Sequence, residues 1–146
     1  MRVMKTYLTA LAAFGIGLAI AHVAADYRQS ESSARVYQSP GGTKLRVLVD
    51  ESSLKGSEVE IAELTFAPNS DSGDHKHGVT ETFYVLEGQL EHVVNGQSMK
   101  LTPGMVGSVR PPADVRHKTG PAGARTLVIW APGGEIARVT ARWRAQ

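Results

Sequence analysis

The sequence of 146 residues contains no cysteine. Disulfide bonds, thiolate metal ligands and a cysteine nucleophile are therefore excluded, and an oxidising compartment would not damage the chain. A glycine-rich phosphate-binding loop, a nucleophile elbow and a pair of catalytic carboxylates are also missing from the sequence. Internal repeats and low-complexity domains are absent as well. Whatever chemistry this chain performs must therefore depend on other side chains.

The small net positive charge of the chain comes entirely from its first 25 residues. Residues 1–25 contain two bases, Arg2 and Lys5, and no acid, so the formal charge of +2 belongs to this segment. The remaining residues hold 14 basic and 14 acidic side chains, since two of the 16 bases lie in the first 25 residues. Arg138, Arg142 and Arg144 form a basic end that is typical of a solvated terminus. The charge pattern therefore predicts no nucleic-acid partner.

The first 25 residues have the composition of a secretory signal. Two bases precede an apolar stretch, residues 6–25, which is uncharged apart from the possible charge on His22 and ends in the small residues Val23-Ala24-Ala25 before a polar switch. This pattern predicts a signal peptide at residues 1–25, and the alternative is an uncleaved membrane anchor at residues 6–25. No twin-arginine pair is present, so export of an unfolded chain is expected. In both cases the folded part is predicted to be periplasmic or secreted, with no membrane contact beyond this leader.

The rest of the chain has the composition of one β domain. Hydrophobic residues make up 42% of the sequence, and 15 glycines and 7 prolines divide it into short extended runs. About eight to ten short strands with almost no helix predict an antiparallel barrel or a double-sheet jelly roll. We expect a flexible lead-in at residues 26–35, the barrel at 36–132 and a C-terminal tail at 133–146. The tail pattern fits either a helix or a strand.

Two histidines and a glutamate stand close together in the middle of the chain. His75 and His77 are two residues apart, so an extended backbone directs both side chains to one face. Glu81 follows four residues later and shares a face with Phe83 and Val85 of the next extended run. If the chain reverses between them, two imidazoles and a carboxylate converge as half of a metal coordination shell. The alternative is a solvated edge or a hydrogen-bonded core.

This stretch resembles the first motif of the cupin family. The spacing His75-x-His77-x3-Glu81-x6-Gly88 matches that motif, and Gly104 through Pro112 to His117 resembles the second. The resemblance covers roughly residues 36–132. It implies a single antiparallel jelly-roll barrel that binds one divalent metal ion through three histidines and one glutamate, and it also implies a possible homodimer. The implied ligands are His75, His77, Glu81 and His117.

The chain departs from the family motifs at three positions. Asn69 and Asp114 stand where the family often has glycine, and Pro121 stands where it often has asparagine. Asparagine and aspartate are the non-glycine residues that best tolerate positive φ, so both turns are expected to persist. The Pro121 departure affects the register after His117 rather than the ligand itself.

Four ligands would leave an octahedral ion two open positions, enough for a small substrate or for substrate with dioxygen. Nitrogen and oxygen ligands suit Fe, Mn, Co, Ni, Cu or Zn without choosing among them, and loading outside the cytoplasm favours Cu²⁺ and Zn²⁺. We expect an enzyme resembling cupin dioxygenases that acts on a small molecule at the barrel mouth. The alternatives are a non-redox lyase or isomerase and a non-catalytic binding module.

The sequence does not identify a dedicated catalytic residue. A structural or surface role is expected for His92, although it could be an acid or base if it faces the lumen. Asp74 could orient His75, and Tyr84 and Arg116 could touch substrate or face outward. Candidates for an apolar wall of the site, or for ordinary core packing, are Phe83, Tyr84, Val85, Met105 and Val109.

Overall fold

The computed structural model describes residues 35–146. The predicted signal peptide or anchor at residues 1–25, and residues 26–34 of the predicted lead-in, lie outside the described residues. Within residues 35–146, none of the helices is long and apolar enough to cross a membrane. The described residues form one compact unit, Arg35–Gln146, so the predicted tail at 133–146 packs as part of it.

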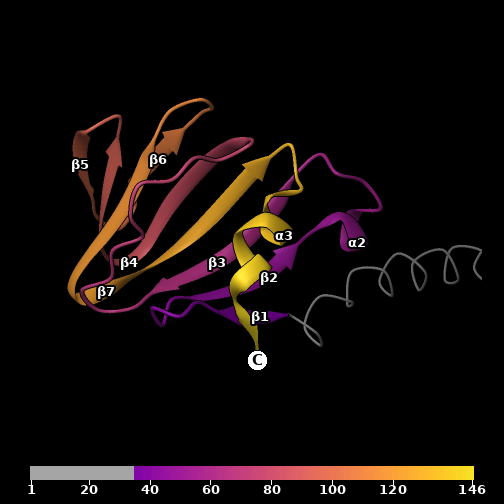
Figure 1. Ribbon diagram of the computed structural model, residues 1–146, viewed down its shortest axis with the longest axis horizontal. Coiled ribbons are helices and arrows are strands. Elements are labelled where there is room, and N and C mark those ends of the chain that lie inside the picture. Colours follow the sequence, from indigo (N-terminus) through magenta and orange to yellow (C-terminus); the bar gives the residue numbers. More distant parts are fainter. Residues whose placement is uncertain (1–34) are drawn as a thin grey trace, which may run out of the picture. The chain divides into compact units, whose positions relative to one another are not determined.

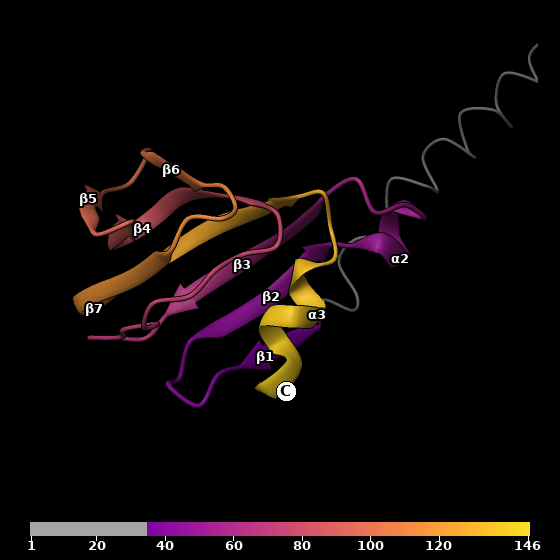
Figure 2. The ribbon, with the colours of Figure 1, turned by 45° about the horizontal axis from the view of Figure 1, so that its top comes forward.

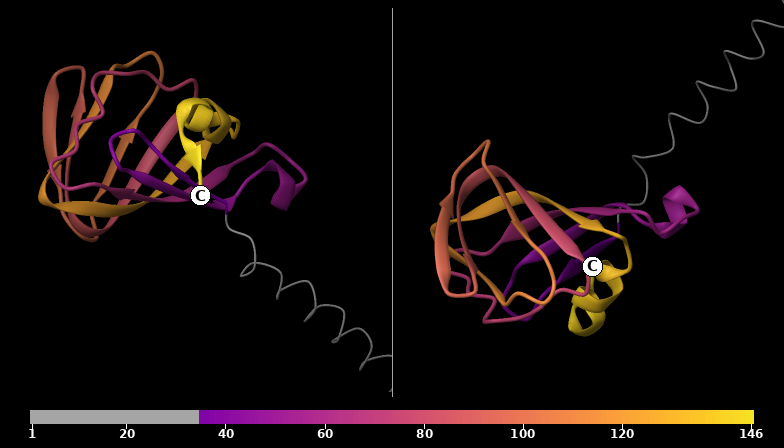
Figure 3. Two further views of the ribbon diagram at one scale, coloured as in Figure 1. Left: turned by 60° about the horizontal axis from the view of Figure 1, so that its bottom comes forward. Right: turned by 90° about the horizontal axis from the view of Figure 1, so that it is seen from above.

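The described residues form a curved antiparallel sheet of eight strands (Figure 1). Along the sheet the order is β5-β4-β7-β3-β2-β1-β8, and β6 pairs with a second part of β4. Figures 2 and 3 show the strands curving around an interior, with the short helix α3 (Glu135–Val139) at one side of it. This all-β jelly-roll barrel confirms the predicted fold class. The strands are β1 (Val36–Gln38), β2 (Lys44–Val49), β3 (Glu60–Phe66), β4 (Thr80–Val94), β5 (Gln97–Leu101), β6 (Val106–Val109), β7 (Val115–Ala131) and β8 (Arg144–Ala145).

Two strands are much longer than the sequence pattern indicates. The apolar runs at residues 80–86 and 90–94 are parts of the single strand β4, and the segment Gly120-Pro121-Ala122-Gly123, which has the composition of a turn, lies inside β7. β4 pairs with β7 along its whole length, and register shifts occur on either side of Glu87 and Gly88, between Val85 and Glu87 and between Gly88 and Leu90. Such irregularities bend a strand without ending it. At these two places the glycine and proline signals therefore mark bends within a strand.

Alternating side chains of the strands fill the barrel. In β4, Phe83 and Val85 are buried, whereas Tyr84 between them is 42% exposed. β3 and β7 follow the same period of two, and their inward residues join one hydrophobic core. Because apolar burial drives folding, this alternation fixes which face of each strand turns inward. It also carries the polar side chains at inward positions, such as Glu81, into the interior.

The turn predictions have mixed outcomes. Asn95 and Gly96 have φ values of 48° and 80°, and they join β4 to β5 as the hairpin turn that an Asn-Gly pair between two strands favours. Asn69 has φ of 53°, so asparagine serves there in place of glycine as expected. The chain also turns just before Asp114, where the Ala113 backbone N–H donates to the Arg110 carbonyl oxygen at 3.0 Å. Asp114 itself is not among the positive-φ residues of the described chain. Its backbone N–H instead donates to the Asn95 side chain at 3.0 Å.

The C-terminal segment contains both a helix and a strand, so each alternative for the tail holds for part of it. α3 (Glu135–Val139) and a 3-10 turn (Thr140–Arg142) precede β8, which pairs with β1. The Glu60 carboxylate accepts a hydrogen bond from the Ile136 backbone N–H at 2.8 Å, at the start of α3. A second short helix, α2 (Glu51–Leu54), occupies the polar segment after β2 and begins with a capping box at Asp50.

Gly88 and Gly96 offer a matched test of the strand geometry. Both have positive φ, 74° and 80°, but a Cβ added at Gly88 would lie 2.3 Å from the Gly123 carbonyl oxygen, whereas one at Gly96 meets nothing within 4 Å. Gly96→Ala is expected to cost about 1–2 kcal/mol from the left-handed conformation alone. Gly88→Ala should cost about 1–3 kcal/mol more, because the backbone of β7 must shift. Urea unfolding measures both, and equal costs would contradict the close approach.

Candidate metal centre

A loop before β4 brings His75 to the barrel interior. His75 pairs with Val115 at the start of β7, and the two residues exchange backbone hydrogen bonds at 2.9 and 2.8 Å. Its ring Nδ1 lies 3.0 Å from the Gly73 carbonyl oxygen, to which a protonated Nδ1 would donate. The two histidines therefore lie in an extended loop tied to β7 rather than in a regular strand. The Nδ1 contact leaves Nε2 as the nitrogen that can bind a metal.

Glu81 enters the interior from β4. It lies opposite Trp130 of β7, and the indole N–H of Trp130 donates to Glu81 Oε1 at 2.9 Å. Both side chains are buried, with exposed fractions of 2% and 1%. A buried carboxylate needs hydrogen bonds or opposite charge to remain ionised. Trp130 satisfies one oxygen and so fixes the rotation of the carboxylate, while Oε2 stays available.

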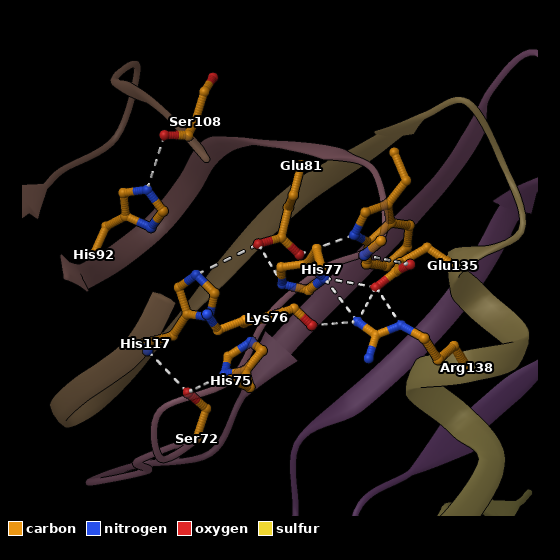
Figure 4. A network of polar contacts seen from close by, with 12 residues as sticks. Ser72, His75, Lys76, His77, Glu81, His92, Ser108, His117, Glu135 and Arg138 are labelled. Carbon is orange, nitrogen blue, oxygen red and sulfur yellow. Dashed lines mark hydrogen bonds and ion pairs between the residues drawn. The ribbon is translucent and has the colours of Figure 1, made fainter. Parts of the chain in front are cut away.

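His77 is oriented by a second carboxylate. Glu135, at the first position of α3, accepts a hydrogen bond from His77 Nδ1 at 2.8 Å, and Arg138 Nε donates to the same carboxylate oxygen at 2.8 Å (Figure 4). A carboxylate on Nδ1 is the usual means of directing Nε2 of a metal-binding histidine towards the ion. Burial raises the pKa of Glu135, but the hydrogen bonds from Arg138 and His77 outweigh burial and hold it below its ordinary value.

The pKa values of His77 and His117 are shifted in opposite directions. Burial lowers the pKa of His77, but the carboxylates of Glu81 and Glu135 outweigh burial and raise it above its ordinary value. Burial also lowers the pKa of His117, and the neighbouring histidines His92, His75 and His77 add to this effect, so it lies well below its ordinary value. His117 is therefore a neutral imidazole with a free lone pair, which is the form that binds metal.

Three buried atoms that could bind a metal ion lie close together without hydrogen-bond partners. His77 Nε2 lies 2.9 Å and His117 Nε2 lies 3.6 Å from Glu81 Oε2, yet none of these three atoms forms a hydrogen bond. The His75 ring centroid lies 4.9 Å from that of His77 and 5.4 Å from that of His117. Unpaired buried polar atoms cost about 1–3 kcal/mol each, so they call for a missing partner.

The spacing of these atoms fits a shared ion. Ligands bound at about 2.1 Å to one metal lie roughly 3.0–3.4 Å apart, whether the geometry is octahedral or tetrahedral. As they stand, however, no group of three or more such side chains in residues 35–146 is arranged as a formed metal site. The assignment of His75, His77, Glu81 and His117 as ligands therefore stays a prediction, and the unpaired buried atoms of His77, Glu81 and His117 are the observation in its favour.

These donors line a cavity of about 620 Å³. The volume lies within the range of roughly 300–1,000 Å³ that is usual for small-molecule sites. Of the five predicted wall residues, only Phe83 lines it; Val85 and Val109 are buried core, and Tyr84 and Met105 are exposed. The apolar lining is instead supplied by Leu64, Phe66, Phe83, Trp130, Val139 and Trp143.

The remaining sequence candidates lie away from the cavity. Asp74 is 71% exposed and its carboxylate lies 3.9 Å from Arg116, so it does not orient His75. Arg116 binds Asp71 through two hydrogen bonds of 2.7 and 2.5 Å, and Tyr84 faces outward. His92 faces the interior but stacks on His117, with ring centroids 5.2 Å apart, and does not line the cavity. Burial lowers the pKa of His92.

Sequence reasoning missed three residues of the centre, namely Trp130, Glu135 and Arg138. Trp130 carried a weak signal, because it occupies an apolar strand where an indole N–H must find a partner once buried. Glu135 carried only its place after Gly133-Gly134, which is typical of the acidic first turn of a helix. Its contact with His77 spans 58 residues, and nothing in the local pattern indicates it.

Comparisons with known proteins find the same architecture among cupins. The family model of the cupin domain matches residues 62–133. An RmlC-like cupin from Shewanella frigidimarina has a similar structure, with a TM-score of 0.62 and 23% sequence identity over 71% of this chain and 88% of that chain. The polyketide cyclase RemF from Streptomyces resistomycificus has a TM-score of 0.59 and 25% identity, covering 71% and 76% of the two chains.

A third solved structure is Bacillus subtilis oxalate decarboxylase, which contains Mn(II) centres. Its TM-score is 0.59 with 15% identity, and the similarity covers 73% of this chain but 31% of that longer chain. No curated protein matches this chain in sequence. Similarity at these identities shows the fold, and the chemistry must be argued from the site itself.

Proposed function

Because this chain contains a cupin domain, we propose that it is a metal-dependent enzyme that acts on a small molecule bound in the barrel cavity. The observation that carries the proposal is the set of three orphaned buried donors, His77 Nε2, Glu81 Oε2 and His117 Nε2. Together with His75 they lie on the wall of a cavity of about 620 Å³. An ion held there would be reached directly by a small molecule.

A divalent ion held by these four residues would supply Lewis acidity and, if redox-active, the activation of dioxygen. Other side chains of the protein would orient the ligands and exclude water. Glu135 fixes the tautomer of His77, Trp130 fixes the Glu81 carboxylate, and the surrounding apolar side chains exclude water from the bound substrate. The Mn(II) centres of the Bacillus subtilis neighbour support use of a divalent ion, without identifying it here.

Within this class we propose dioxygenase-like chemistry. The described cavity wall offers no ionisable group beyond the four implied ligands and two that are already paired, Asp71 with Arg116 and Arg138 with Glu135. A lyase or isomerase would need a free acid or base at the substrate. The lack of a free acid or base in the described cavity wall also favours one further candidate, a binding module without turnover.

Oxygen consumption distinguishes these candidates. The protein loaded separately with Fe²⁺, Mn²⁺, Cu²⁺ or Zn²⁺ should consume dioxygen with at least one member of a panel of phenols and small organic acids, and only with a redox-active ion. Product formation without oxygen uptake would indicate a lyase or isomerase instead. Tight retention of one ion with no turnover on any panel would indicate the binding module.

We also propose that the folded part acts outside the cytoplasmic membrane, as the composition of residues 1–25 predicts. Affinity then favours Cu²⁺ or Zn²⁺ as the ion acquired after export. Metal analysis of protein isolated from its native compartment tests this. Iron or manganese as the sole ion would contradict it.

A further inference from the structure

Arg138 reaches the cavity from a segment beyond the matched cupin domain. It lies on α3, its side chain is 50% exposed, and it lines the same cavity as the donor cluster. Nε and Nη2 donate to Glu135, and Nη2 also donates to the Lys76 carbonyl oxygen at 2.8 Å. Nη1 has no hydrogen-bond partner among residues 35–146 (Figure 4). The N–H groups of Nη1 therefore remain free to donate to a ligand.

The charges around this free nitrogen favour an anion once a metal is bound. Glu81 and Glu135 contribute two negative charges, and Arg138 contributes one positive charge that is not lost at any physiological pH. Asp71 is neutralised by its ion pair with Arg116. The histidines must be neutral to bind metal. A divalent ion therefore brings the net charge of the wall to about +1, which suits a singly charged substrate.

We propose that Arg138 binds a carboxylate of the substrate through Nη1, and that the substrate is a small carboxylic acid with an apolar body. This inference rests on the proposed function and names the substrate class of the same site. The aromatic side chains of Phe66, Trp130 and Trp143 line the cavity and would pack against the apolar body. Arg138 is then a specificity-determining residue as well as a clamp on Glu135.

The test compares two probes of the same shape, cyclohexanecarboxylate and its uncharged isostere cyclohexanecarboxamide. Their affinities for the full chain loaded with Zn²⁺ are measured by calorimetry, with metal content determined for each sample. The native chain should prefer the carboxylate. Arg138→Gln should reduce that preference about tenfold, because it removes a charge-assisted hydrogen bond. The direct attraction of the carboxylate to the ion is the same in the native chain and in Arg138→Gln, so it cancels when their preferences are compared.

Matched variants separate recognition from structure. Arg142→Gln removes the same charge from the adjacent 3-10 turn, at an exposed residue outside the cavity lining, and should leave the preference unchanged. Arg138→Lys keeps the charge but not the fork, and should retain part of the preference. If Arg138→Gln keeps the native preference at equal metal content, or if Arg142→Gln loses it equally, the inference is overturned.

The metal-free chain provides the second arm. If Arg138→Gln releases the ion, the two metal-free proteins, checked for folding by circular dichroism, are compared instead. The native protein should then show about threefold more preference for the carboxylate than the variant, and equal preferences would overturn the inference. A native chain that binds no divalent ion would contradict the proposed function, while this arm would still test Arg138.

Discussion

Replacing His77 with alanine is expected to lower the affinity for a divalent ion more than about a hundredfold, because loss of a direct ligand should exceed the 10–100-fold effect of supporting residues. The residue His77 is 7% exposed, and its Nε2 lies 2.9 Å from Glu81 Oε2. Without it, the donor set would be reduced to three side chains. Competition with a chromophoric chelator for Zn²⁺ measures the affinity, and bound metal per chain gives the stoichiometry.

His92→Gln is the matched control for this substitution. His92 is also a buried histidine, 2% exposed, but it is not among the residues that line the cavity. We expect this variant to keep one ion per chain with an affinity within a few-fold of the native value. Unchanged stoichiometry and affinity in His77→Ala would remove His77 from the centre, and equal losses in both variants would point to general damage to the fold.

Replacing Glu135 with glutamine is expected to weaken metal binding about 10–100-fold, the usual cost of removing a carboxylate behind a metal-binding histidine. The substitution preserves shape but removes the negative charge that accepts hydrogen bonds from His77 at 2.8 Å and from Arg138 at 2.8 Å. The imidazole becomes a weaker base and loses its fixed orientation. The same chelator competition reports the change.

Glu60→Gln controls for loosening of α3. The Glu60 carboxylate is also buried and accepts a hydrogen bond from the Ile136 backbone, but it does not touch an imidazole. A glutamine oxygen can still accept this bond, so metal affinity should fall by less than about threefold; a neutral hydrogen bond is worth only about 0.5–1.5 kcal/mol. If the two variants weaken binding equally, the effect of Glu135 operates through helix packing and not through His77.

The sequence was sufficient to predict the barrel and the candidate donors. Alternation in β4 places Glu81, Phe83 and Val85 on one face, and the structure has all three buried. That prediction works because the period of a strand is a local property of the chain. The resemblance to two short motifs then adds His117, which the barrel brings within 3.6 Å of Glu81.

The rest of the centre depends on long-range contacts. The loop that carries His75 is set by backbone pairing with Val115, and Glu135 reaches His77 only because β8 and the Glu60 contact hold the C-terminal segment against the barrel. No local pattern specifies such pairings. The strand bends around Glu87 and Gly88 are likewise not specified locally, because glycine signals either a turn or a bend when only local sequence is considered.

The central claim is that His75, His77, Glu81 and His117 hold one divalent ion on the cavity wall. A crystal structure of the chain grown with Mn²⁺, with anomalous diffraction recorded at the manganese edge, tests it most directly. The account predicts one anomalous peak per chain, about 2.0–2.3 Å from the three Nε2 atoms and a Glu81 oxygen. A chain without a peak in the cavity, or with the ion bound away from these four side chains, would contradict it.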